Sequence, residues 1–216
     1  MKRRGKRYYE RKNEYYYKKA KDSGYRARSA YKLIQMDERF GLLKKNQFIV
    51  DLCGAPGGFS QYIKKKLNGH CQILLVDLEK VEKLEGVTCL QLDITSDDIV
   101  EKIRSTVSDM RDDRLPIVDL LVADCSPKVI GRWSTDHARQ VFLCEQALTL
   151  ATSLKARVFV TKVFQGELFE SFVTAVKQSY CNIRLHKPKA SRKSSAEIYL
   201  LAKELLENTE NLEMRL

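Results

Sequence analysis

Five charged residues stand where short apolar runs end in this sequence, at Asp51, Asp77, Asp93, Asp124 and Lys162. Apolar runs that alternate with helical patterns predict the strands of a mostly parallel sheet, and such sheets bind ligands beyond the carboxyl ends of their strands. Each charge alone is more typical of a helix cap or a solvated strand end. Together the five predict a binding site at one edge of the sheet.

The turn after the first run, Asp51-Leu-Cys-Gly-Ala-Pro-Gly-Gly-Phe, contains the glycines Gly54, Gly57 and Gly58. Glycines let backbone amides approach a ligand closely at the start of a helix. The turn lacks GxxxxGK[ST] and GxGxxG, which argues against a phosphate loop and an NAD-dependent dehydrogenase. A cofactor with an adenosine end and an amino-acid end fits better, and we expect S-adenosylmethionine.

This cofactor assigns a role to each residue of the turn and of the next two strand ends. We expect Asp51 near the ammonium group and the three glycines along the chain of the cofactor. Asp77, 26 residues after Asp51, is placed like the ribose-binding acid of nucleotide folds, and Asp93 would reach the adenine amino group.

Hydrophobic periodicity supplies the elements that would position these residues. The pattern predicts helices over residues 29–40, 59–67, 97–107, 135–153 and 167–178, with Ser29 capping the first and Gly41 ending it. It predicts strands over residues 47–50, 72–76, 88–92, 117–123, 156–161, 181–186 and 197–202. The fold class is therefore α/β, with a doubly wound, mostly parallel seven-stranded sheet. Only a polar connection joins the last two strands, so one of them should run antiparallel.

The composition limits the class of protein. The chain has 216 residues, of which 44% are hydrophobic and 31% charged, values that are typical of one globular domain. No apolar run reaches the length of a membrane span and the first residues lack the apolar stretch of a secretory signal, so we expect a cytosolic protein away from membranes. We also expect a monomer. The six cysteines are scattered without a CxxC pair, so we expect neither a metal site nor a disulfide framework.

The basic character is concentrated at the start of the chain. Residues 1–28 contain twelve Lys or Arg, three acids and six of the ten tyrosines. Cations interleaved with flat rings suit RNA, although a solvated tail has a similar composition. We therefore expect an RNA-binding arm over residues 1–28, the main domain over residues 29–203, and an acidic tail over residues 204–216 that forms a frayed helix.

Five stretches, in order, carry a specific resemblance: YRARSAYKL (25–33), DLCGAPGGFSQ (51–61), LLVADCSP (120–127), VTKVFQG (160–166) and KASRKSSAEIYLL (189–201). With them the chain resembles the FtsJ family (also called RlmE or RrmJ) of S-adenosylmethionine-dependent RNA ribose 2'-O-methyltransferases, which have a Rossmann-like sheet. The resemblance implies a catalytic tetrad of Lys32, Asp124, Lys162 and Glu197, and it counts Asp124 with the cofactor-binding residues too. Phe59 stands where many members have Trp, next to the methionine end of the cofactor.

The chemistry can be argued from the residues. Methyl transfer to a ribose hydroxyl is an in-line displacement in which the hydroxyl proton must leave. Lys162 is our candidate base, although an ordinary lysine has a pKa of about 10.4 and is protonated. Burial and Lys32 would lower that pKa, whereas Asp124 and Glu197 would raise it. Alternatively, a charged Lys162 orients the hydroxyl, and water or Asp124 takes the proton.

The sequence also suggests RNA contacts and a target. We expect the connection KPKASRK (187–193), with Arg26 and Arg28, to form the walls of an RNA groove, with a plain solvated loop as the alternative. His137 and Arg139 would be structural or touch phosphate, and Trp133 would stack on a base or pack over the site. The resemblance implies a uridine of large-subunit ribosomal RNA, free or within the ribosomal particle, as the target. A tRNA anticodon loop is the alternative target, and a non-catalytic, RNA-binding ribosome-assembly factor is the alternative class.

Overall fold

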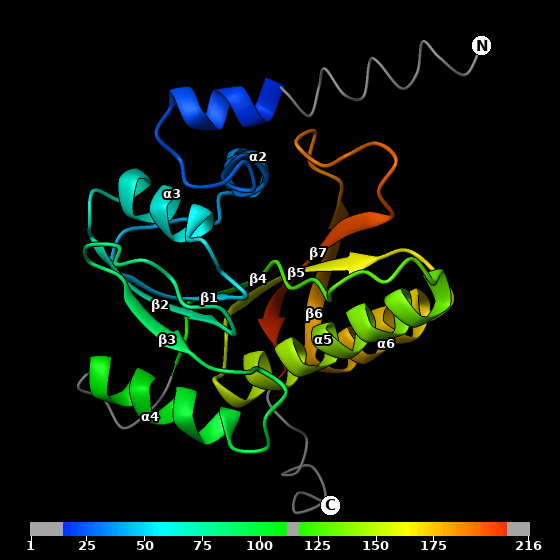
Figure 1. Ribbon diagram of the computed structural model, residues 1–216. Helices are drawn as coiled ribbons and strands as arrows, with labels where there is room; N and C mark the ends of the chain where they lie inside the picture. Colours follow the sequence, from blue (N-terminus) through cyan, green and yellow to red (C-terminus); the bar gives the residue numbers. More distant parts are fainter. Residues whose placement is uncertain (1–14, 112–116, 207–216) are drawn as a thin grey trace, which may run out of the picture.

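The computed structural model describes residues 15–111 and 117–206 (Figure 1). Residues 1–14 of the expected arm and residues 207–216 of the expected tail lie outside this part of the chain. Its seven strands are β1 (Gln47–Leu52), β2 (Cys71–Asp77), β3 (Thr88–Gln91), β4 (Leu120–Ala123), β5 (Val158–Phe164), β6 (Tyr180–His186) and β7 (Glu197–Leu205).

The strands form one sheet in the order β3-β2-β1-β4-β5-β7-β6. The pairs from β3 to β5 are parallel, and β7 runs antiparallel to both β5 and β6. The predicted fold class and the single reversed strand near the end of the chain are confirmed. The strand order reverses between β1 and β4, and ligands of doubly wound sheets bind beyond the carboxyl ends at this point.

Helices cover both faces of the sheet (Figure 1). One face packs against α2 (Ala30–Phe40) and α3 (Gly58–Lys66), and the other against α4 (Ile99–Arg111), α5 (Trp133–Ser153) and α6 (Phe169–Ser179). Burial on both faces explains why the central strands are continuous apolar runs rather than alternating ones. Among the described residues, no helix is long and apolar enough to cross a membrane.

Residues 15–22 form a further helix at the end of the expected arm. Its Tyr16 is buried against Tyr31 of α2 and Ala190 of the connection before β7, together with Ala20. Gln35 joins the same parts, since its amide donates to the Tyr16 hydroxyl and accepts from the Ala190 backbone. This described part of the arm is therefore packed onto the domain, next to the connection.

Three expectations about local structure are wrong. Ser29 makes no capping hydrogen bond, because its backbone is already helical, whereas Gly41 does end α2 in the left-handed conformation. Glu204 and Leu205 belong to β7 rather than to a frayed helix, since Leu205 pairs with Tyr180 of β6. Cys53 and Cys125 form a disulfide, although we expected none. They follow neighbouring strands, β1 and β4, a proximity that their separation of 72 residues in sequence hides.

Candidate functional site

The four tetrad residues meet at the carboxyl ends of β4 and β5. Lys162 lies in β5, Asp124 follows β4, Glu197 begins β7, and Lys32 reaches down from α2. Asp124 Oδ1 lies 3.1 Å from Lys162 Nζ and 3.6 Å from Lys32 Nζ, which in turn lies 3.1 Å from Glu197 Oε1. Lys162 Nζ also donates to the Asp124 backbone carbonyl at 2.9 Å. The structure thus brings together the four side chains that the resemblance implied.

A fifth side chain, Tyr199, belongs to the same cluster, and sequence reasoning missed it. Its hydroxyl donates to Asp124 Oδ1 at 2.6 Å, and Lys32 Nζ lies 5.6 Å from the centre of its ring. Tyr199 stands directly opposite Lys162 across the β5–β7 pair. The available signal was its position two residues after Glu197, because alternate residues of a strand share a face.

Burial makes the charges of this cluster strongly interdependent. Burial alone would raise the pKa of Asp124, but Lys162, Lys32 and the Tyr199 hydroxyl outweigh it and lower that pKa to about 2. For Lys32, burial would lower the pKa, but Asp124 and Glu197 together raise it above its ordinary value. Burial and the neighbouring carboxylates also raise the pKa of Tyr199 well above its ordinary value. Near neutral pH, Asp124 is therefore an anion, Lys32 a cation and Tyr199 a neutral hydrogen-bond donor.

A cavity of about 940 Å³ adjoins Asp124, a size within the usual range for small-molecule sites. Asp77, Asp93 and Asp124 line it, as the sequence analysis expected of cofactor-binding residues. The remaining lining is mixed, with apolar side chains that suit a flat ring: Leu78, Leu92, Ile94, Phe142 and Leu143. Asp77 accepts from the backbone amides of Ala55 and Glu79, which orients its carboxylate.

Asp51 and the three glycines of the turn are absent from the lining of this cavity, whereas Cys53 and Ala55 of the same turn belong to it. Asp51 is fully buried, and its Oδ2 accepts both the backbone amide and the hydroxyl of Ser60 in α3, at 3.1 and 2.6 Å. Its Oδ1 has no hydrogen-bond partner among the described residues. Burial raises the pKa of this carboxyl to about 7. Gly54 covers Asp51 so closely that a Cβ there would lie 2.9 Å from the carboxylate.

Gly57, Gly58 and Phe59 complete the turn. Gly57 has φ 103°, which other residues rarely adopt, and a Cβ on Gly58 would lie 3.1 Å from Ala27 and Ser29. Phe59 is only 3% exposed and packs into the core on the α2 and α3 side. The glycines therefore permit close packing of the turn, and a role of Phe59 beside the cofactor stays a prediction.

The donor set of this region fits an adenosyl amino acid. The cavity offers carboxylates for hydroxyl and amino groups and apolar side chains for a base. The unpartnered buried oxygen of Asp51 is an acceptor without a donor, behind the turn. Asp77, Asp93 and Asp124 are the carboxylates of the cavity that would hold such a molecule. No cluster of His, Cys, Asp and Glu that could hold a metal occurs in the described ranges.

Arg26 does not form a wall of an RNA groove as we expected. Its guanidinium donates to the backbone carbonyls of Pro56, Glu82 and Lys83, and its own amide donates to Gln61. It thus joins the glycine turn to the segment after β2, because these carbonyls need donors that the strands do not supply. Arg26 supports the cofactor side of the site.

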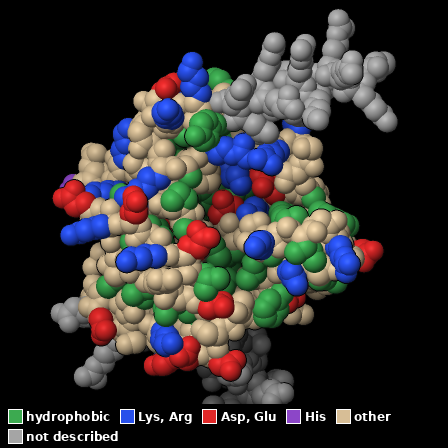
Figure 2. Space-filling model, viewed as in Figure 1, with side chains coloured by type: hydrophobic (Ala, Val, Ile, Leu, Met, Phe, Trp, Pro, Cys, Tyr) green, Lys and Arg blue, Asp and Glu red, His purple; other side chains and the backbone are tan. Residues whose placement is uncertain are grey.

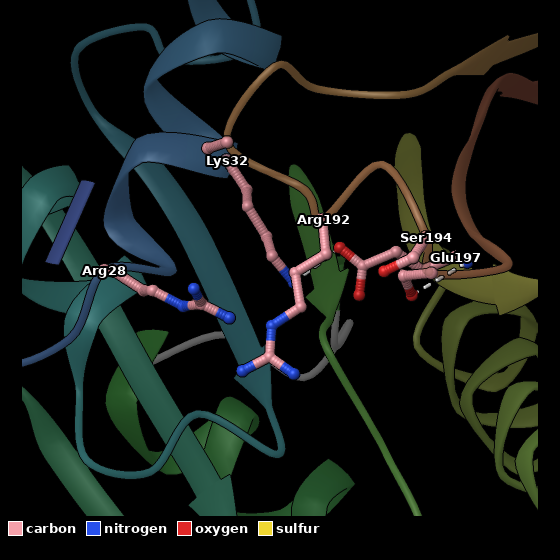
Figure 3. A pocket seen from close by; sticks show the side chains of 7 residues that line it. Arg28, Lys32, Arg192, Ser194 and Glu197 are labelled. Atoms are coloured by element: carbon pink, nitrogen blue, oxygen red, sulfur yellow. Dashed lines mark hydrogen bonds and ion pairs between the residues drawn. The ribbon is translucent and has the colours of Figure 1, made fainter. Parts of the chain in front are cut away.

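Arg28 and the connection before β7 form a second cavity, of about 460 Å³, above the tetrad. Arg28, Lys32, Arg192, Ser194, Ser195 and Glu197 line it, with Ala190. Figure 2 shows cationic side chains gathered at a hollow in this face, and in Figure 3 Arg28 and Arg192 point from different segments into the same space. Burial lowers the pKa of Arg28, and the nearby Arg192 lowers it further. Two guanidinium groups in one cavity suit a phosphate group.

His137 and Trp133, at the start of α5, have structural contacts. His137 is buried, and its Nε2 accepts the backbone amide of Leu168. The Trp133 ring lies nearly parallel to the rings of His137 and Phe164, with centroid distances of 5.6 and 6.2 Å. His137 is therefore a packing residue, whereas Arg139 is exposed and lines the larger cavity.

Comparisons with known proteins find both similar sequences and a similar structure. A family model described as FtsJ-like methyltransferase matches residues 25–205. The chain is 40% identical to Ribosomal RNA large subunit methyltransferase E of Methanothrix thermoacetophila, an alignment that covers 89% of this chain and 73% of the relative. It is 38% identical to the protein of the same name from Archaeoglobus fulgidus, over 89% of this chain and 96% of the relative. A crystal structure described as a ribosomal RNA methyltransferase from Plasmodium falciparum superimposes with a TM-score of 0.73 at 25% identity, over 85% of this chain and 100% of that one.

Proposed function

The chain belongs to the FtsJ-like methyltransferase family, and we propose that it methylates a ribose 2'-hydroxyl of large-subunit ribosomal RNA with S-adenosylmethionine as the donor. The observation that carries the proposal is the position of Asp124. This residue lies between the two lysines, contacts Tyr199 and also lines the larger cavity. A donor bound in the larger cavity and an RNA ribose in the smaller one would therefore meet at the tetrad.

When bound, S-adenosylmethionine supplies a methyl group on a positively charged sulfur. The protein must then hold the ribose hydroxyl in line and remove its proton. Lys162 is the group that we expect to accept this proton, because the residue is only 5% exposed and its amine is held by two contacts with Asp124. Lys32, whose pKa is raised, stays a cation and stabilises the negative charge that develops on the oxygen.

Asp124 and Glu197 hold the two amines, and Tyr199 fixes Asp124. A purely structural role is disfavoured, since desolvation of the charges makes buried ion pairs weak stabilisers of a fold. The same reasoning disfavours a non-catalytic assembly factor, which would not require two lysines and two acids at one strand edge.

The RNA contacts follow from the second cavity. Arg28 and Arg192 lie above the tetrad, where they would bind a phosphate near the target ribose. The helix of residues 15–22 packs against Ala190 of the same connection, so the basic arm and the connection would act as one RNA-binding wall. The ribosomal target is the one named for the relatives from Methanothrix thermoacetophila and Archaeoglobus fulgidus.

The test is to incubate the protein with methyl-labelled S-adenosylmethionine and RNA from a strain that lacks it. Wild type and Lys162→Ala are compared, and ribose methylation is mapped by resistance to alkaline cleavage. One protected position in large-subunit RNA, absent with Lys162→Ala, is the expected result. Label in tRNA would show that the protein is an RNA methyltransferase whose target is tRNA instead of ribosomal RNA. No transfer to free RNA or to ribosomal particles, despite measurable cofactor binding, would favour the assembly factor.

A further inference from the structure

Three large apolar side chains are exposed on the segment that leads from Asp124 to α5. Val129, Ile130 and Trp133 are 62%, 51% and 53% exposed. Exposed apolar side chains that cluster on a surface, rather than occurring singly, mark interaction sites. We call residues 128–133 the apolar loop, and neither the tetrad nor the smaller cavity uses these three side chains.

The apolar loop is held in place by a buried acid. The backbone amides of Ile130 and Gly131 each donate to the carboxylate of Asp136 at 2.9 Å, and Asp136 is only 3% exposed. The loop therefore presents its side chains in a fixed arrangement. A fixed surface loses little conformational entropy when a partner binds to it.

The Trp133 ring rests on two other rings that are themselves anchored. His137 accepts a hydrogen bond from the backbone of Leu168, and the backbone amide of Phe164 donates to Gln140. Trp133 lies within 15° and 18° of the planes of the His137 and Phe164 rings. Since half of its surface stays exposed, the indole can stack with a further flat ring.

This stacking surface lies beside the reaction centre. Phe164 follows Lys162 by two residues on the same face of β5, about 7 Å along the strand, and it pairs with Glu197 of β7. Figure 1 shows the start of α5 beside the end of β5 and the beginning of β7. A group stacked on Trp133 would therefore be a close neighbour of a group bound at the tetrad.

The charges around Trp133 indicate what it binds. Lys128, Arg132 and Arg139 are exposed, and the only acid among residues 128–139 is Asp136, which is buried. Cations that flank an exposed aromatic ring are typical of sites for single-stranded nucleic acid, where bases stack and phosphates meet the cations.

We propose that Trp133 stacks on an unpaired base of the RNA substrate, beside the nucleotide whose ribose reaches the tetrad, while Lys128 and Arg132 contact its phosphates. This proposal rests on the proposed function and adds a second RNA contact, separate from Arg28 and Arg192. The RNA would then be held on two sides of the reaction centre.

Trp133 is the only tryptophan of the chain, so its fluorescence reports this contact directly. The titrant is a short single-stranded oligoribonucleotide with a 5' label, added without S-adenosylmethionine so that no methyl transfer takes place. We expect quenching of tryptophan emission that follows the same binding curve as the anisotropy of the label. Inorganic polyphosphate, which has charge but no bases, should bind without this quenching.

Variants separate stacking from packing. Trp133→Leu should weaken oligoribonucleotide binding about 5- to 150-fold, raise the KM for RNA by a similar factor and leave kcat nearly unchanged. Trp133→Phe keeps a ring and should lose much less. Leu185→Ala, which removes an exposed apolar side chain from β6, is the matched control and should bind like wild type. The affinity for S-adenosylmethionine checks that each variant is folded.

The stacking proposal would be overturned if RNA bound without a change in tryptophan emission and bound Trp133→Leu as tightly as wild type. Methylation by the wild type would in that case still support the proposed function. Emission that changes with protein concentration alone would show that a second copy covers Trp133, which would also overturn the stacking proposal. If wild type neither binds nor methylates any RNA, the proposed function fails, and this proposal fails with it. Quenching by wild type alone would still support stacking if Trp133→Leu did not fold.

Discussion

The hydroxyl of Tyr199 donates a 2.6 Å hydrogen bond to Oδ1 of Asp124, the oxygen that also faces Lys162 and Lys32. One carboxylate oxygen thus has three donors around it, two of them amines. A carboxylate with this many donors is held in one orientation, and so are the groups that it binds. We therefore expect Tyr199 to act on the reaction through Asp124, as a positioning residue.

Replacing Tyr199 with Phe should lower kcat about 10- to 150-fold, because a hydrogen bond to a charged group contributes about 1.5 to 3 kcal/mol. The affinity for S-adenosylmethionine should change much less than kcat, since Tyr199 does not itself line the larger cavity and affects it only through Asp124. Single-turnover methyl transfer and a cofactor titration measure the two effects. An unchanged rate would show that the lysines alone fix Asp124.

Arginine substitutions distinguish the two lysines of the tetrad. Lys32→Arg keeps the cation that Asp124 and Glu197 hold and should retain part of the activity. Lys162→Arg cannot accept a proton, because a guanidinium stays charged, so kcat should fall about 10²- to 10⁴-fold. Single-turnover rates from pH 6 to 9 measure this. Similar residual rates for the two variants would mean that Lys162 works as a cation and that water or Asp124 takes the proton.

The sequence predicted the sheet and the edge where the site lies, because apolar runs and their charged ends are local patterns. It did not predict Tyr199, the disulfide or the role of Arg26. These depend on pairing between β5 and β7, on the adjacency of β1 and β4, and on which carbonyls lack donors after folding. Such contacts join residues 30 to 75 positions apart, and no periodic pattern in the sequence encodes them.

Element ends were less accurate than element positions. Asp51 and Lys162 were expected as the residues that end their strands, yet β1 continues to Leu52 and β5 to Phe164. Asp51 is consequently buried inside the sheet, where its carboxylate bonds Ser60. The residue types indicated a site, but the depth of each side chain became known only from the packing.

The stability of the fold should depend on the ionisation of Asp51. Its folded pKa of about 7 lies above the ordinary 3.8, so the folded state binds more protons than the unfolded state between these values. The free energy of unfolding should therefore fall by roughly 4 kcal/mol as pH rises from 4 through 7. Urea unfolding measures this slope, and Asp51→Asn should remove it. If the same pH dependence persisted in Asp51→Asn, groups other than Asp51 would be its cause.

The same carboxyl predicts a proton release when the cofactor binds. If the ammonium of S-adenosylmethionine lies near Asp51, as the sequence analysis expects, its charge lowers the pKa of Asp51 below 7. Calorimetry at pH 7 in buffers of different ionisation enthalpy should then detect the release of up to about half a proton with wild type and none with Asp51→Asn. Equal proton release by wild type and Asp51→Asn would show that the ammonium group does not lie near Asp51.

Arg26 and Arg192, far apart in sequence, should affect the binding of different ligands. Arg26→Ala removes the bonds to Pro56, Glu82 and Lys83 and should weaken S-adenosylmethionine binding about 10-fold, because each lost bond contributes roughly 0.5 to 1.5 kcal/mol. Arg192→Ala removes a cation from the smaller cavity and should weaken RNA binding instead. Cofactor and oligoribonucleotide titrations of both variants test this. Weaker RNA binding by Arg26→Ala alone would restore the original expectation of a groove wall.

The disulfide between Cys53 and Cys125 should stabilise both the fold and the cofactor site. It closes a loop across 72 residues, for which chain entropy gives about 4 kcal/mol, and Cys53 lines the larger cavity. A reducing agent should therefore lower the unfolding temperature and the affinity for S-adenosylmethionine. The double variant Cys53→Ser and Cys125→Ser should have a low unfolding temperature and a low affinity before reduction, and the reducing agent should not change either value. Cys71→Ser, which removes a free cysteine, should behave like wild type. Full stability and full affinity after complete reduction would show that packing around β1 and β4 holds the site without the bond.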